Sequence, residues 1–144
     1  MKETILVING PNLNMLGRRD PAVYGTTTYS GLKTELKAYI VGLGYKPVIF
    51  QSNYEGKIID IIQRGGYNAI IINAGALSHY SYAIRDALAD CPAVKFEAHL
   101  SDIYSREEFR RKSVITEVCN GSFVGMGVGS YLRAIAAAVE KMKT

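Results

Sequence analysis

The sequence predicts an α/β protein, a three-layer sandwich in which helices cover both faces of a parallel sheet. Short and almost wholly apolar runs, such as residues 4–8 and 69–72, are typical of strands that are buried on both faces. The segments between such runs are longer, and their apolar residues recur at helical spacing. Because strand-like and helix-like segments alternate along the chain, the expected sheet is parallel.

Five segments are predicted to be strands. Pro47 lies within the second of them, and a proline in a strand favours the start of the strand or a position at the edge of the sheet. The other four segments contain no proline. The predicted strands are residues 4–8, 46–50, 69–72, 94–98 and 122–126.

Four helices are predicted between and after these strands. Gly44 stands where the C-terminal cap of the first helix belongs, and Pro92 stops the third. A flavodoxin-like sheet with the strand order 2-1-3-4-5 accommodates this succession of elements, and residues 1–144 are expected to form a single domain. The apolar positions of the predicted helices span residues 32–43, 58–62, 81–90 and 131–142.

The composition excludes several classes of protein. Of the 144 residues, 48% are hydrophobic and 21% are charged, as in an ordinary globular protein. The basic residues behind the net charge of +4 are scattered, so we expect no nucleic-acid binding. No apolar stretch reaches the roughly 18 residues of a membrane span, and we expect no signal peptide. Cys91 and Cys119 form no CxxC pair, which favours reduced thiols in a cytoplasmic protein.

The connection after the first predicted strand, residues 9–27, is unusually long. It exceeds the roughly 12–15 residues above which a loop in a compact domain is usually functional or disordered. Pro11 and Pro21 stiffen it, which favours a lid held in position, while a decorated surface loop is the alternative. The polar residues of this connection are Asn12, Asn14, Arg18, Arg19, Asp20 and Tyr24.

Polar side chains also follow the third and fourth predicted strands. Asn73 and His79 come after the third strand, and Glu97 and His99 lie at the end of the fourth. Ligands of such sheets bind outside the carboxyl ends of the strands, so both histidines of the chain fall at the expected binding edge. Glu97 and His99 flank one residue and therefore point to the same side of a strand. A carboxylate in that position can orient the imidazole and stabilise its protonated form, as a general acid requires.

Three further patterns carry weaker signals. Residues 125–130 (GMGVGS) resemble a dinucleotide-binding loop, but a serine replaces the last glycine, so a turn that allows close helix packing is favoured. Glu97 and His99 lack a third metal ligand at a recognised spacing, and no metal is expected. Residues 105–108 (SREE) resemble a capping box that opens a short helix. Arg106 and Arg110 would share a face of that helix, and solvated charges are the favoured interpretation.

Four stretches resemble the type II 3-dehydroquinate dehydratase family in order and spacing. This family implies the elimination of water from 3-dehydroquinate to give 3-dehydroshikimate, a step of the shikimate pathway. The elimination is anti and proceeds through an enolate, without metal or organic cofactor. The stretches are NGPNLNMLGRRDPAVYG (residues 9–25), FQSNYEG (residues 50–56), IINAGALSHYSYAIRDAL (residues 71–88) and EAHLSDIYSREEFRRKS (residues 97–113).

The chain departs from the family pattern at a few positions. None of them is a position that the family uses for its core chemistry. Arg18 stands where threonine is frequent, and Tyr54 stands where histidine is common. Ala74 replaces a proline, and Asp102 and Tyr104 replace an asparagine and a histidine.

The resemblance implies roles for five catalytic residues. Tyr24 resembles the base that removes the proton beside the ketone, and Arg19 the group that supports its anionic form. Asn12 would help to hold a water at the enolate oxygen. His99, backed by Glu97, would protonate the departing hydroxyl. Ionising a tyrosine at pH 7 costs about 4 kcal/mol, which a cation within ~4–6 Å offsets in part.

The resemblance also implies the contacts to the substrate and the assembly. Asn73 and the backbone of Leu100 and Ser101 resemble the carboxylate site. Contacts to the ring hydroxyls are implied for His79, Arg110 and Asp86. His79 and Asp86 are seven residues apart, about 10 Å along a helix, so Asp86 is expected to reach the site of a neighbouring subunit. The family's dodecamer, built from trimers, implies such a neighbour.

Two other hypotheses stay open on the sequence. A flavodoxin-like binding or signalling module would lack the set formed by Tyr24, Arg19 and His99, or would carry a phosphate-binding loop after the first strand. An inactive structural relative is opposed only by the intact catalytic set. Biosynthesis of aromatic precursors and breakdown of quinate are both compatible with the sequence.

Overall fold

The five strands of the computed structural model, which describes residues 2–144, form one sheet in the order β2-β1-β3-β4-β5. Every pair of neighbouring strands runs parallel. The predicted flavodoxin-like strand order is therefore confirmed. The strands are β1 (Thr4–Asn9), β2 (Lys46–Gln51), β3 (Ala69–Asn73), β4 (Val94–His99) and β5 (Ser122–Val124).

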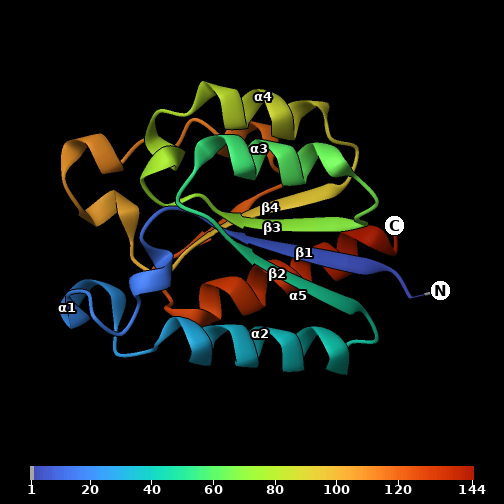
Figure 1. Ribbon diagram of the computed structural model, residues 1–144, viewed down its shortest axis with the longest axis horizontal. Coiled ribbons are helices and arrows are strands. Elements are labelled where there is room, and N and C mark those ends of the chain that lie inside the picture. The colour runs from blue at the N-terminus through green and yellow to red at the C-terminus, as the bar shows by residue number, and fades with distance from the viewer. Residues whose placement is uncertain (1) are drawn as a thin grey trace.

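Helices cover both faces of this sheet, as expected for a three-layer sandwich. Figure 1 shows α3 and α4 on one face and α2 and α5 on the other. These helices are α2 (Tyr29–Gly42), α3 (Glu55–Arg64), α4 (Tyr82–Asp90) and α5 (Val128–Met142). No helix within residues 2–144 is both long enough and apolar enough to cross a membrane.

Strand β1 lies in the middle of the sandwich and contributes to both cores. Ile5 and Val7 pack into the core beneath α2 and α5, whereas Leu6 and Ile8 pack into the core beneath α3 and α4. All four side chains are fully buried. Since successive side chains of a strand point to opposite faces, both faces of this stretch of β1 are apolar, and burying each of the four side chains contributes roughly 1.5–3 kcal/mol.

Several predicted boundaries shift by a few residues. Strands β3 and β4 each continue one residue further, to Asn73 and His99, so both polar side chains belong to the strands themselves. Strand β5 ends two residues early, at Val124, because Gly125 has a φ of 79° and packs against Asp102. The glycine-rich segment is thus a turn before α5, as predicted. Pro47 lies in β2, an edge strand.

The long connection after β1 folds back onto the sandwich. It forms the short 3₁₀ helix η1 (Leu13–Met15) and the single-turn helix α1 (Pro21–Tyr24), which lies at the left of Figure 1. Leu13 and Leu16 are 3% and 4% exposed and belong to the core beneath α2. These apolar anchors hold the connection in place, as expected for a lid held in position.

Gly10 approaches the end of β3 too closely for a side chain. A Cβ at this position would stand 2.3 Å from the carbonyl oxygen of Ala74. The Gly10 N–H donates to the carbonyl of Asn73 at 2.7 Å, which fixes the two strand ends against each other. The glycine is therefore required by packing.

We predict that Gly10→Ala lowers the free energy of unfolding by about 1–3 kcal/mol, as overpacking does. Gly42→Ala is the matched control, because Gly42 lies in α2 with nothing within 4 Å of its would-be Cβ. The control should gain about 0.5 kcal/mol from helix propensity and reduced chain entropy. Urea unfolding of both variants measures the difference, and a Gly10→Ala protein as stable as the control would contradict the packing argument.

Candidate active site

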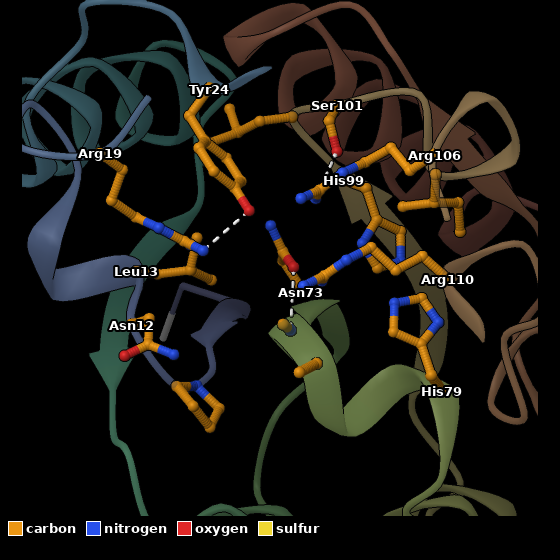
Figure 2. A pocket seen from close by; sticks show the side chains of 15 residues that line it. Asn12, Leu13, Arg19, Tyr24, Asn73, His79, His99, Ser101, Arg106 and Arg110 are labelled. Atoms are coloured by element: carbon orange, nitrogen blue, oxygen red, sulfur yellow. Dashed lines mark hydrogen bonds between the residues drawn. The ribbon is translucent and has the colours of Figure 1, made fainter. Parts of the chain in front are cut away.

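The polar residues at the carboxyl ends of β3 and β4 and in the segments after β1, β3 and β4 gather around one pocket (Figure 2). The pocket encloses about 520 Å³, part of which is open to solvent. Glu97 and Asp86 are the two predicted site residues that do not line it: Glu97 lies behind His99, and Asp86 lies elsewhere on α4. The predicted residues that do line it are Asn12, Arg19, Tyr24, Asn73, His79, His99, Leu100, Ser101 and Arg110.

Asn12 is held in an uncommon backbone conformation. Its φ of 71° is the only positive φ of a non-glycine residue within residues 2–144. The Asn12 N–H donates to Oδ1 of Asn53 at 3.0 Å, and the Gln51 amide donates to the same oxygen at 3.1 Å and to the Gly10 carbonyl at 3.2 Å. Gln51 and Asn53, from the FQSNYEG stretch, thus hold the backbone turn at Asn12. Left-handed backbone at a pocket wall is a feature of functional sites.

Tyr24 and Arg19 form a contact pair on one side of the pocket (Figure 2). Nη2 of Arg19 donates to the Tyr24 hydroxyl at 2.7 Å, and the guanidinium carbon lies 3.8 Å from the centre of the tyrosine ring. Arg106 adds a second cation, with its guanidinium carbon 5.1 Å from the same ring centre. Two guanidinium groups thus lie against the Tyr24 ring, within the range of a cation–π contact.

His99 and Glu97 form a buried pair at the end of β4. Nε2 of His99 lies 2.6 Å from Oε2 of Glu97, and both side chains are at most 5% exposed. The carboxylate can only accept at this contact, so Nε2 carries the hydrogen and Nδ1 is the free nitrogen of the ring. The carboxylate also accepts from Ser113 Oγ at 2.7 Å and from the Thr116 hydroxyl. The imidazole is therefore fixed in tautomer and orientation.

The partners of Glu97 keep it ionised despite its burial. Burial on its own raises the pKa of this carboxyl. The hydrogen bonds and charge of His99, with the hydroxyls of Thr116 and Ser113, outweigh burial, and the pKa lies below its ordinary value of 4.5. A carboxylate that remains charged can balance a proton on His99.

His79 lies beside His99 and is held by the backbone. The two imidazole rings stack with centroids 6.5 Å apart, and Nδ1 of His79 donates to the Lys112 carbonyl at 2.7 Å. Burial lowers the pKa of His79, and the positive charge of Arg110 acts in the same direction, while the bond to Lys112 opposes them. A neutral His79 whose Nδ1 carries the hydrogen leaves Nε2 as an acceptor.

The capping box predicted at residues 105–108 does not form. Ser105 Oγ donates to the Asp102 carboxylate at 2.8 Å, and this local bond replaces the cap. The segment contains two separate 3₁₀ helices, η3 (Ile103–Ser105) and η4 (Glu108–Arg110). Arg106 and Arg110 both line the pocket, so the interpretation as solvated charges was wrong for them.

Arg106 is a site residue that the sequence interpretation missed. The signal available in the sequence was its spacing of four from Arg110 in a stretch that resembles a known family. Glu107 contacts both arginines, at 3.8 Å from Nε of Arg106 and 2.9 Å from Nε of Arg110. This exposed carboxylate thus pairs with both guanidinium groups.

The glycine-rich turn before α5 holds the backbone that follows β4. Gly127 N–H donates to the Leu100 carbonyl at 3.0 Å, and Gly125 N–H donates to the Ser101 carbonyl at 3.1 Å. These bonds fix the backbone of residues 100–101 at the pocket wall. The turn before α5 thereby serves the site although it resembles a dinucleotide loop in sequence.

Asp86 is exposed on α4 and does not reach the pocket of its own chain. Its neighbour Arg85 is engaged within the chain by the Val114 carbonyl at 2.9 Å and by Glu117 at 3.1 Å. No group of three or more His, Cys, Asp or Glu within residues 2–144 is arranged to hold a metal ion.

Comparison with known proteins gives matches over most of the chain. Residues 3–139 match the profile of the Dehydroquinase class II family. The chain is 50% identical over 131 residues to the 3-dehydroquinate dehydratase of Thermotoga neapolitana, which covers 91% of this chain and 90% of that protein. It is 48% identical over 143 residues to that of Halalkalibacterium halodurans, with 98% and 99% covered. The crystal structure of type II dehydroquinase from Butyrivibrio crossotus is 46% identical, with a TM-score of 0.94 and 96% and 98% covered.

The lowered pKa of Glu97 predicts a pH-dependent contribution to stability. This contribution is fully present above the ordinary carboxyl value of 4.5 and is lost as the pH falls through the lower value of the folded protein. We predict that Glu97→Gln is about 1.5–3 kcal/mol less stable at pH 7. The difference from the natural protein should shrink as the pH drops below 4.5. Urea unfolding across this range measures it, and a constant difference would show that the charge of Glu97 adds nothing.

Proposed function

Because the chain belongs to the class II dehydroquinase family, it dehydrates 3-dehydroquinate, and we propose that Tyr24 and His99 perform the two proton transfers of that reaction. The observation that carries the proposal is the arrangement of these groups around one pocket. The Tyr24 hydroxyl accepts from Arg19 at 2.7 Å, and His99 presents an imidazole that is backed by Glu97 at 2.6 Å. Each group has the partner that its role requires.

Tyr24 acts as the base in the first step. Its anion takes the proton from the carbon beside the ketone, and the electron pair moves to the ketone oxygen to form an enolate. Arg19 stabilises the anion through its hydrogen bond, and the guanidinium of Arg106 lies near the same ring. Asn12, in its left-handed turn, holds a water that donates to the enolate oxygen.

His99 acts as the acid in the second step. The enolate collapses, the carbon–oxygen bond to the hydroxyl breaks, and His99 gives its proton to the leaving hydroxyl, which departs as water. Glu97 balances the charge of the protonated imidazole before this transfer. The proton on Tyr24 then returns to His99 through solvent, which restores both groups. Because side chains and solvent carry every proton, no step of the proposed reaction uses a metal or an organic cofactor.

The remaining residues of the pocket bind the substrate. Asn73 and the backbone of Leu100 and Ser101 receive the carboxylate at the ends of β3 and β4. His79 and Arg110 contact the ring hydroxyls. The neutral His79 accepts through Nε2, and Arg110 donates, which suits hydroxyl groups because they do both.

We predict that Tyr24→Phe folds normally and loses turnover by a factor on the order of 10² or more, as expected for the loss of a positioned base. Tyr45→Phe is the matched control, because Tyr45 lies just before β2 at the opposite edge of the sheet. Its turnover should equal that of the natural protein. An ultraviolet assay for the conjugated product measures both, and near-normal turnover in Tyr24→Phe would remove this residue from the mechanism.

We also propose that residues 1–144 act as one catalytic domain in the cytoplasm. The free thiols of Cys91 and Cys119 suit a reducing compartment. Burial, and to a lesser degree the charge of Glu97, raises the pKa of Cys119 to about 12, so this residue stays a thiol. Neither cysteine has a part in the proposed chemistry.

Asp86 completes the site of a neighbouring subunit in this proposal, within a dodecamer built from trimers. Asp86 is exposed and remote from the pocket of its own chain, so a contact to the same substrate requires a second chain. The surface beside it is rich in exposed aromatic rings. Tyr54, Tyr80 and Tyr82 are 61–65% exposed, and the bond from Ser81 to Glu55 ties their segments together at 2.5 Å. Such rings are typical of the buried centre of an interface.

We predict that the protein assembles into an oligomer of about twelve subunits, in line with the family, with sites shared between chains. Light scattering coupled to size exclusion measures the mass, and a fully active monomer would contradict the proposal. Subunit mixing is the sharper test. Reassembled mixtures of Asp86→Ala and Tyr24→Phe should regain roughly a quarter of natural activity, because mixed interfaces create intact sites. If Asp86 served its own chain, no intact site would form and activity would stay low.

A further inference from the structure

A buried chain of hydrogen bonds joins α5 to the floor of the pocket. Nδ2 of Asn73 donates to the Tyr131 hydroxyl at 2.9 Å, and this hydroxyl donates to Oδ1 of Asn9 at 2.6 Å. Nδ2 of Asn9 in turn lies 3.4 Å from the Phe50 carbonyl of β2. Tyr131 and Asn9 are fully buried, and Asn73 is 3% exposed.

The direction of each bond in this chain is fixed. Oδ1 of Asn73 accepts from the Gly75 N–H at 3.1 Å, so Nδ2 is the group that faces Tyr131. The Tyr131 hydroxyl gives its one hydrogen to Asn9 and therefore offers a lone pair to Asn73. Burial raises the pKa of Tyr131 far above its ordinary value, so the hydroxyl keeps this hydrogen.

Two anchors determine how Asn73 presents its amide. The last torsion of an asparagine side chain is broad and weakly restrained on its own. With the oxygen tied to Gly75 and one N–H tied to Tyr131, the amide plane is set. The second N–H of Nδ2 is left for the pocket that Asn73 lines (Figure 2). A single fixed N–H donor matches a carboxylate oxygen.

We propose that Tyr131 is a positioning residue, which aims the Asn73 amide at the substrate carboxylate. This inference rests on the proposed assignment of Asn73 to that carboxylate. Packing alone does not account for the hydroxyl, because a phenylalanine would fill the same core beneath α5. Removing the hydroxyl would leave Nδ2 of Asn73 and Oδ1 of Asn9 buried without this partner, a costly state for both.

Tyr131→Phe tests the proposal through the split between KM and kcat. Loss of the anchor weakens a binding contact that is present in ground state and transition state alike, so KM should rise by about three- to tenfold. The turnover number kcat should stay within about twofold of the natural value. An equal loss in kcat with unchanged KM would overturn the proposal.

The decisive measurement repeats Tyr131→Phe in an Asn73→Ala background. If Tyr131 acts through Asn73, the second substitution adds no further rise in KM once the amide is gone. If KM rises by the same factor in both backgrounds, Tyr131 acts independently and the proposal fails. If Asn73→Ala alone leaves KM unchanged, the assignment of Asn73 to the carboxylate fails first, and the inference falls with it.

Two further variants separate positioning from stability. Ile135→Val removes one methylene from the same buried face of α5 and should cost about 0.5–1.5 kcal/mol of stability without raising KM. Asn9→Ala removes the group that accepts the hydrogen of the Tyr131 hydroxyl, and it leaves the Asn73 side chain itself unchanged. It should raise KM by a smaller factor than Tyr131→Phe, again only when Asn73 is present, so the proposal stays testable if Tyr131→Phe folds poorly. A rise in KM with Ile135→Val of the same size would assign the effect to general destabilisation.

Discussion

The burial of polar groups at the carboxyl edge of the sheet is the constraint on which the rest of the structure depends. Asn9, Asn73, Glu97 and His99 end three central strands, and none is more than 4% exposed. A buried polar group is costly unless it is hydrogen-bonded. The partners come from other parts of the chain: hydroxyls after β4 reach Glu97, and a hydroxyl of α5 reaches Asn73 and Asn9. The apolar strands form the core of the fold, and these hydrogen bonds hold the polar side chains of the site in position.

The polar residues at the strand ends could be predicted because the pattern of apolar residues is a local property of the sequence. An apolar run followed by Asn73, or closed by Glu97 and His99, places those side chains at a sheet edge without knowledge of contacts. The strand order followed from the alternation of strands and helices. The ends of the elements were less certain, since packing against Asp102 stops β5 at Val124.

The hydrogen-bond partners of the site residues could not be predicted, because a local pattern says nothing about contacts between distant parts of the chain. Tyr131 has the spacing of a core residue on a helix, and only the folded chain shows what its hydroxyl contacts. Ser113 and Thr116 lie 16 and 19 residues after Glu97, with no period that links them to it. The place of Arg106 in the site was not predicted, because the expected helix does not form. The Ser105 hydroxyl donates to Asp102 instead, and two 3₁₀ helices replace that helix.

The bond from Tyr131 to Asn9 joins residues 122 positions apart, near the two ends of the chain. Closing a loop of that length comes late in folding, because distant contacts must pay the entropy of the chain between them. Before α5 docks, β1, β3 and β4 can already pair with one another. Asn73 then still lacks its bond to the Tyr131 hydroxyl. Full positioning of the Asn73 amide is thus acquired only when α5 docks against the sheet.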